Sequence, residues 1–219
     1  MTTAGTVEIG SRVSPALHRL LDSQAIFVSR RFAFREFLPD DIRKMAAVAR
    51  EHPKIDATAE LYRPTDAEDA HRWLGEPTAP AYATALHWAI SSRANGRMSG
   101  YGGLNDIALR RRQAKLRFWI RCGIEGQDYS NFANATECVG AVLDYAFTHL
   151  TLERVYALQL TRQDRPGQIL AGTDMTIDGY LRKRFHNDGM FEDIACWSIT
   201  TDVWVPRVGQ GASQGSPVR

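Results

Sequence analysis

The segment from Ala135 to His149 most constrains the fold, because it is an amphipathic helix placed between two strand-like runs. The runs 114–124 and 154–160 on either side are rich in aromatic and β-branched residues, as strands are. A helix with one apolar face has to bury that face, and the neighbouring strands offer a sheet to bury it on. The apolar residues recur at spacings of three and four, and they are Val139, Val142, Leu143, Ala146, Phe147 and Leu150.

The remaining elements extend this unit into a larger sheet. An Asn-Gly pair (Asn95-Gly96) between two strand-like runs favours a type I′ hairpin turn. An antiparallel meander followed by helix, strand, helix and strand indicates one mixed, mostly antiparallel α/β sheet flanked by helices. The other predicted elements are helices over 14–24, 38–53, 65–76 and 167–172, and strands over 31–37, 86–93, 97–107 and 191–200.

The composition is that of an ordinary globular protein, with 44% hydrophobic residues, 24% charged residues and a formal net charge of +2. Three cysteines in apolar surroundings fit a reducing compartment better than a disulfide framework or a zinc site. No apolar run approaches the ~18 residues of a membrane helix, and no signal peptide is evident. We therefore expect a cytoplasmic protein that binds neither metal nor membrane. Its expected parts are an N-terminal extension over 1–30, one domain over 31–205 and a disordered tail over 206–219.

Four ordered stretches carry a family resemblance that covers roughly residues 31–201. They are "RFAFREFLPDD", "AKLRFWI", "ATECVGAVLDYAFTHLTLERVYALQL" and "DGYLRKRFHNDGMFEDIACWSIT". Together they resemble the GNAT superfamily of N-acetyltransferases, and within it the RimJ/RimL-like branch that acetylates ribosomal-protein alanines. The resemblance implies a splayed sheet that holds acetyl-CoA in a cleft between the fourth and fifth strands.

The resemblance also implies which residues face the cofactor. The pantetheine arm would run along a strand, and the pyrophosphate would rest on the loop that opens the following helix. Such a helix start suits a diphosphate, since it carries unpaired N–H groups and the positive end of the dipole. The residues implied for the pantetheine are Phe118, Trp119, Ile120, Arg121 and Cys122, and those for the pyrophosphate are Ser130, Asn131, Phe132, Ala133, Asn134 and Ala135.

The sequence departs from the family pattern in three places, at five residues. The pyrophosphate loop has lost its Gln/Arg and its central glycine, so the acetyl-CoA motif is degenerate; Ser130 and Ala133 stand there. Lys115 replaces a glutamate that would take the proton of the amine, and Asp164 and Gly167 replace an Asn and a Ser. Either the site still transfers acyl groups with other residues, or the donor has changed or been lost.

Several residues are candidates for catalysis or acceptor binding. Glu137 could act as a base, although a carboxylate stabilised by the helix dipole is the simpler interpretation. Arg110, Arg111 and Arg112 form either a solvated turn or a weak site for phosphate or RNA. The catalytic candidates are Tyr129, Glu137, Asp164 and Tyr180, and the acceptor-side candidates are His87, Tyr101 and Asp106.

The function expected from the sequence is transfer of an acetyl or other acyl group from acyl-CoA to a primary amine. The acceptor would be a protein N-terminus or a small molecule, and the protein a monomer or homodimer. Two alternatives stay open. One is a GNAT-fold enzyme with a changed donor, for example an aminoacyl-tRNA, and the other is a non-catalytic binding protein with this fold.

Overall fold

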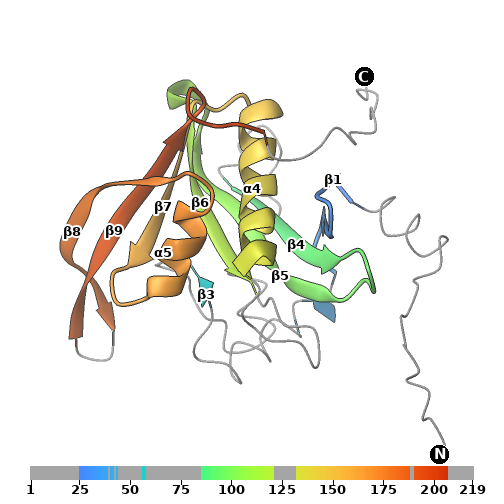
Figure 1. Ribbon diagram of the computed structural model, residues 1–219, viewed down its shortest axis with the longest axis horizontal. Coiled ribbons are helices and arrows are strands. Elements are labelled where there is room, and N and C mark those ends of the chain that lie inside the picture. Colours follow the sequence, from blue (N-terminus) through green and yellow to red (C-terminus); the bar gives the residue numbers. More distant parts are fainter. Residues whose placement is uncertain are drawn as a thin grey trace, which may run out of the picture.

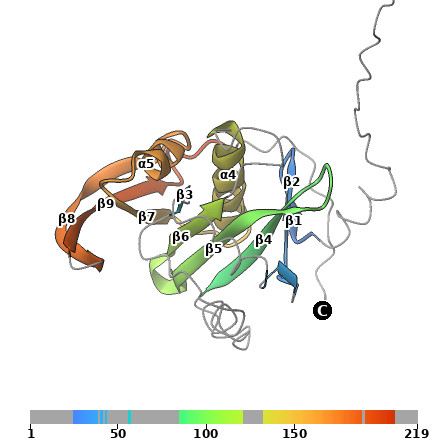
Figure 2. The ribbon, with the colours of Figure 1, turned by 90° about the horizontal axis from the view of Figure 1, so that it is seen from below.

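The computed structural model describes residues 25–38, 40–41, 43, 56–57, 85–120, 132–187 and 190–206. Helices α4 (Phe132–Thr148) and α5 (Asp164–Ala171) lie on one face of a sheet (Figures 1 and 2), and the 3-10 helix η2 (Leu109–Arg111) forms a turn. The nine strands of the described sheet are β1 (Phe27–Val28), β2 (Phe32–Arg35), β3 (Asp56–Ala57), β4 (Leu86–Ser92), β5 (Met98–Ala108), β6 (Gln113–Ile120), β7 (Arg154–Leu160), β8 (Thr176–Asn187) and β9 (Met190–Thr200).

The sheet is mixed and opens in the middle. Its order is β1-β2-β4-β5-β6-β7-β9-β8, with β3 paired to β6, and among the described pairings only β6–β7 is parallel. That pairing joins Gln113–Lys115 to Arg154–Tyr156, after which the two strands diverge (Figure 1). Parallel neighbours need a crossover connection, and α4 lies in it. The predicted mixed, mostly antiparallel splayed sheet with flanking helices is confirmed.

The main core lies between α4 and the sheet. Along β6, Ala114, Leu116 and Phe118 are buried at every second position, as a strand with one face toward a helix requires. Five of the six residues of the predicted apolar helix face are buried in this core, and Leu150 is partly buried against it. None of the helices in the described part of the chain is long and apolar enough to cross a membrane.

A buried ion pair explains the acidic start of the predicted helix 38–53. Arg35 at the end of β2 donates from Nη1 and Nη2 to the Asp41 carboxylate at 2.5 and 3.1 Å. Asp41 also accepts from the Leu38 N–H at 2.9 Å, so it fixes the chain as it leaves β2. Asp40, Asp41 and Arg43 are helical, and the rest of the predicted helix lies outside the described residues.

The prediction of a two-residue type I′ turn between β4 and β5 is wrong. Such a turn needs positive φ at both central residues, whereas of Asn95 and Gly96 only Gly96 has it, at 70°. The loop is wider: Gly96 N–H donates to the Ser92 carbonyl at 2.8 Å, and Ser92 N–H donates to the Arg97 carbonyl at 2.9 Å. Asn95 instead accepts from the Arg97 N–H through its side chain at 3.0 Å.

Some predicted boundaries move. Helix α4 begins at Phe132, three residues before the prediction, and α5 begins at Asp164 rather than at residue 167. Strand β1 pairs with β2, so the sheet starts before residue 31. The predicted helices 14–24 and 65–76 and the tail from residue 207 lie outside the described residues.

Gly100 offers a test of how closely β5 and β6 approach. A Cβ added there would lie 2.4 Å from the Trp119 carbonyl oxygen and 2.9 Å from Ile120 Cα, both backbone atoms that cannot rotate away. We expect Gly100→Ala to lower the free energy of unfolding by about 1–3 kcal/mol, the usual cost of overpacking. Denaturant unfolding measures the change.

Gly179 is the matched control, because it also lies in a strand and nothing would lie within 4 Å of its added Cβ. Gly179→Ala should change the free energy of unfolding by no more than about 0.5 kcal/mol. Equal effects at the two positions would contradict the close approach at Gly100.

Candidate functional site

The opening between β6 and β7 is the main feature from which a site can be built. At Trp119 and Ile120, β6 pairs with β5 on one edge and with β3 on the other. Strand β3 therefore lies in the opening, close to α5 (Figure 2). The backbone edge implied for pantetheine pairing at Trp119 and Ile120 is already engaged by the chain itself. The side chains of Phe118, Trp119 and Ile120 are buried as well.

The start of α4 borders this opening. Phe132, Ala133, Asn134 and Ala135 form the first turn of the helix, although the resemblance places them in a loop. Phe132 packs beside the end of α5, since a Cβ on Gly172 would lie 2.8 Å from its ring. Ala133 is exposed, whereas Ala135 is buried in the core. The first turn therefore exposes part of its surface and buries the rest.

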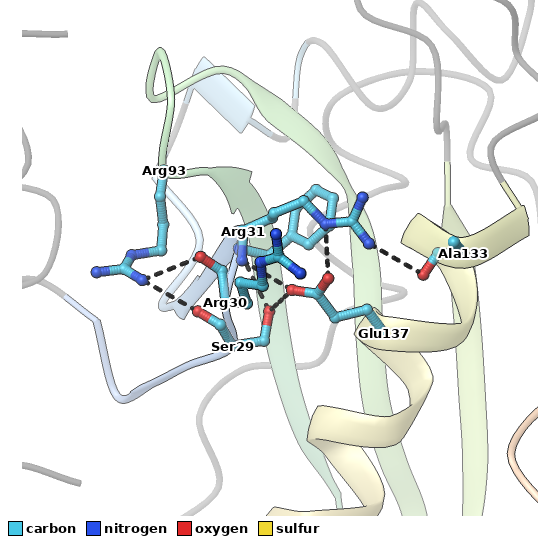
Figure 3. Close-up of polar contacts among 7 residues, drawn as sticks. Ser29, Arg30, Arg31, Arg93, Ala133 and Glu137 are labelled. Atoms are coloured by element: carbon cyan, nitrogen blue, oxygen red, sulfur yellow. Dashed lines mark hydrogen bonds and ion pairs between the residues drawn. The ribbon is translucent and has the colours of Figure 1, made fainter. Parts of the chain in front are cut away.

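Glu137 holds the turn between β1 and β2 against α4 (Figure 3). One carboxylate oxygen accepts from the Ser29 hydroxyl and the Arg31 N–H, each at 2.7 Å, and the other accepts from Arg31 Nε at 2.7 Å. Arg31 also reaches the Ala133 carbonyl from Nη2 at 3.4 Å. The first turn of α4 contains no acidic residue, so stabilisation of Glu137 by the helix start is wrong. Its contacts give it a structural role.

His87, Tyr101 and Arg117 meet on the sheet face opposite α4. The Tyr101 hydroxyl and His87 Nδ1 share a hydrogen bond of 2.7 Å. This hydroxyl lies above Gly103, where an added Cβ would come within 2.5 Å of it. Burial, and then the positive charge of Arg117, lower the pKa of His87 to about 4. Burial raises the pKa of Tyr101, against a smaller effect of Arg117, so both rings are neutral near pH 7.

Asp106 and Lys115 form a neighbouring ion pair with a separation of 2.7 Å. Asp106 has φ of 51° at an irregularity in the β5–β6 register, which brings its carboxylate to the lysine of the adjacent strand. The lysine side chain is 13% exposed and the aspartate 60%. The position where the family has a glutamate thus carries a cation with its own carboxylate beside it.

The departures at Asp164 and Gly167 have structural explanations in α5. Asp164 is exposed in the first turn of this helix, where a negative charge suits the helix dipole. Gly167 lies against buried Gln159, because an added Cβ would be 3.2 Å from Gln159 Oε1. That amide oxygen accepts from Trp197 Nε1 at 3.0 Å.

The other described residues that the sequence suggested for the site lie away from His87, Tyr101 and Arg117. Tyr180 is 62% exposed on β8, the edge strand beyond β9. Arg110 and Arg111 are exposed in η2, whereas Arg112 pairs with Glu153 at 2.6 Å. Among the described residues no group of His, Cys, Asp or Glu side chains could hold a metal ion. The candidates outside the described residues are Tyr129, Arg121, Cys122, Ser130 and Asn131.

Sequence reasoning missed Arg117 as a site residue. In the run 114–120, apolar residues occupy every second position, which places Lys115 and Arg117 together on the other face. Two cations two residues apart on one strand face were the available indication. What the sequence does not contain is the proximity of Arg117 to His87 and Tyr101, which lie on two other strands.

The contacts of Glu137 can be tested by Glu137→Gln. Because charged hydrogen bonds are lost, we expect the free energy of unfolding to fall by about 1–3 kcal/mol. A general base would instead lower kcat by roughly 10²- to 10⁴-fold, whereas we expect kcat to stay within about twofold. Glu153→Gln is the control, since its ion pair with Arg112 is half-exposed and worth less than about 1 kcal/mol. A large loss of kcat in stably folded Glu137→Gln would contradict the structural role.

The environment of His87 predicts an acid-side loss of stability. Its pKa in the folded protein is about 4, below the ordinary value of 6.5, so the unfolded chain takes up the proton first. The stability contributed by neutral His87 is present above pH 6.5 and is lost as the pH falls toward 4. NMR titration of the imidazole, assigned with His87→Gln, should give this low midpoint, and Arg117→Gln should raise it. A wild-type midpoint at or above 6.5 would contradict the burial of the ring.

The chain is similar in sequence and in fold to known acetyltransferases. A family model described as "Acetyltransferase (GNAT) domain" matches residues 31–176. Among curated proteins no match is found. A solved structure described as "Probable acetyltransferase" superposes with a TM-score of 0.66 at 18% identity, covering 81% of this chain and 97% of that one.

Two Vibrio cholerae structures are similar as well. Spermidine N-acetyltransferase, solved with CoA and spermine, has a TM-score of 0.65 at 15% identity, covering 78% of this chain and 96% of that one. A protein provisionally described as a ribosomal-protein-serine acetyltransferase has a TM-score of 0.61 at 16% identity, covering 79% and 95%. At identities this low, the superpositions show a shared fold and nothing further. The family model spans more than half of the sequence, and the chain therefore belongs to the GNAT acetyltransferase family.

Proposed function

We propose that this protein transfers an acetyl or related acyl group from acyl-CoA to a primary amine. The observation that carries the proposal is the opening between β6 and β7, where a short parallel pairing ends at Lys115 and α4 begins beside the gap. Family membership supports it, because GNAT enzymes use acetyl-CoA. One structurally similar protein was solved with CoA and spermine.

The residues that would hold the cofactor are those of the first turn of α4. Four N–H groups at a helix start have no partner within the helix, and the dipole adds positive potential, so a diphosphate fits there. Exposed Ala133 leaves this turn accessible. The edge of β6 at Trp119 and Ile120 fits less well, because β3 is paired to it. Pantetheine would therefore contact β6 closer to Lys115, or β3 would have to leave.

When bound, acyl-CoA supplies an activated acyl carbon, and the chain has to orient an unprotonated amine against it. A nitrogen–carbon bond forms and the carbon–sulfur bond breaks, so one proton leaves the amine and one reaches the sulfur. His87 is an unprotonated ring near pH 7 and the Tyr101 hydroxyl is fully buried beside it. We assign these two residues to the acceptor side, and Tyr129 stays a predicted acid.

In a second candidate function the protein takes the transferred group from a different donor, or it binds a ligand without catalysing a reaction. The observation that favours it is the β3–β6 pairing, because it occupies part of the family's cofactor edge. The missing glycine and Gln/Arg of the pyrophosphate loop point the same way. An aminoacyl-tRNA donor would add salt-sensitive RNA binding.

The charge of the first α4 turn tests the cofactor position. Ala133→Asp adds a carboxylate to an exposed residue, where it suits the helix dipole but repels a diphosphate. We expect acetyl-CoA to bind about tenfold more weakly, with the stability of the protein unchanged. Isothermal titration calorimetry gives the affinity, and mass spectrometry detects acetylated amine.

Leu109→Glu is the control for added charge, because Leu109 is 68% exposed in η2, at the opposite end of β6 from the start of α4. It should leave acetyl-CoA affinity unchanged. No heat and no thermal shift with millimolar acetyl-CoA would overturn the proposed function. A salt-dependent RNA complex in that case would favour the changed donor, and no RNA complex would favour a binding protein.

A further inference from the structure

We propose that the acceptor amine carries a carboxylate, and that Arg117 binds this carboxylate beside His87 and Tyr101. The inference deepens the acyl transfer proposed above and rests on it for the identity of the reacting amine. It commits to small acceptors of the amino-acid type, in which one amine and one carboxylate lie close together. Polyamine acceptors, which carry several cations, are excluded by the same site.

Strand register brings the three residues together. His87 in β4 pairs with Gly103 in β5, and Gly103 pairs with Arg117 in β6, so the three lie in one row across the sheet. Gly103, in the middle of this row, has no side chain, and the Tyr101 ring occupies the space above it: an added Cβ would lie 2.5 Å from the Tyr101 hydroxyl and 2.9 Å from its Cζ. Tyr101, two residues earlier on β5, thus lies beside the row, and its hydroxyl shares the 2.7 Å hydrogen bond with His87 Nδ1. The imidazole, the phenol and the guanidinium therefore lie close together on one face of the sheet.

Arg117 is the group in this row that lacks an acid. Its Nε is buried without a hydrogen-bond partner, and no carboxylate of the described residues forms an ion pair with it. The acid of the neighbouring pair, Asp106, is bound to Lys115 at 2.7 Å. A buried cationic donor left unpaired is costly, and a carboxylate bound in the guanidinium fork removes that cost.

The surroundings discriminate between charges. Burial, and then the positive charge of Arg117, lower the pKa of His87, so a positive charge acts on the imidazole. A second cation placed there would be repelled, whereas a carboxylate would be attracted. Spermine, the ligand of the similar V. cholerae structure, carries several positive charges and would be repelled here. Partial exposure of His87 and Arg117 leaves the row reachable for a small molecule.

The row also lies where an acceptor is needed. Arg117 follows Lys115 by two residues, so it stands just past the point where β6 and β7 separate. Helices α4 and α5 and the core fill the opposite face of the sheet. His87, Tyr101 and Arg117 lie on the other face of the sheet, and we place the acceptor there.

The test compares each common L-amino acid with its own amide by calorimetry, with and without coenzyme A, and includes spermidine. At least one amino acid should bind roughly tenfold or more tightly than its amide, because a charge-assisted contact is lost on amidation. Arg117→Gln should abolish this preference and Arg117→Lys should retain part of it, since lysine keeps the charge but not the fork. Arg110→Gln, in exposed η2, should change nothing. Thermal unfolding checks that each variant is folded.

The inference is overturned if no amino acid binds more tightly than its amide, if spermidine binds most tightly, or if folded Arg117→Gln keeps the preference. Transfer assays with acetyl-CoA on the same compounds separate this from the proposed function. A carboxylate preference in binding without any transfer would overturn acyl transfer and leave the anion site standing. Acyl transfer to amines that shows no preference for a carboxylate would overturn the anion site and leave acyl transfer standing.

Discussion

The short parallel pairing between β6 and β7 is the constraint on which the rest of the structure depends. It requires a crossover, and α4 packs back over the strands it connects. Because the pairing ends at Lys115, the sheet divides into a β1-β2-β4-β5-β6 half and a β7-β9-β8 half. The opening, the position of the α4 start and the place of β3 all follow from this division.

Strand β6 belongs to two environments at once. Its residues at every second position build the core beneath α4, and those between them form a polar face with Lys115 and Arg117. The strand also changes partners along its length, from β7 near Lys115 to β3 at Trp119. Backbone groups freed by the divergence of β7 need new partners, and β3 supplies them. The same need is what an added ligand strand would satisfy.

The residues that depart from the family pattern fall into two groups once their surroundings are known. Gly167 lets α5 approach Gln159, and Asp164 suits the start of that helix, so both fit their structural positions. Lys115 is different, because its ion pair with Asp106 puts a charged pair where the family has a glutamate. The polar face of β6 thus carries two cations, and Arg117 is the one for which the described chain provides no acid.

The sequence by itself determined the sheet and the apolar face of α4, because periodicity and local composition are properties of consecutive residues. Its four ordered stretches carried the resemblance to the family. It misjudged the β4–β5 turn, where a side-chain hydrogen bond of Asn95 replaced the expected backbone conformation. Only the tertiary structure decided that Glu137 anchors the β1–β2 turn and that His87 and Arg117 lie in one row across the sheet with Tyr101 beside them. Those contacts join residues far apart in the chain, and they depend on which strands pair with which, a choice that the pattern of a single segment does not make.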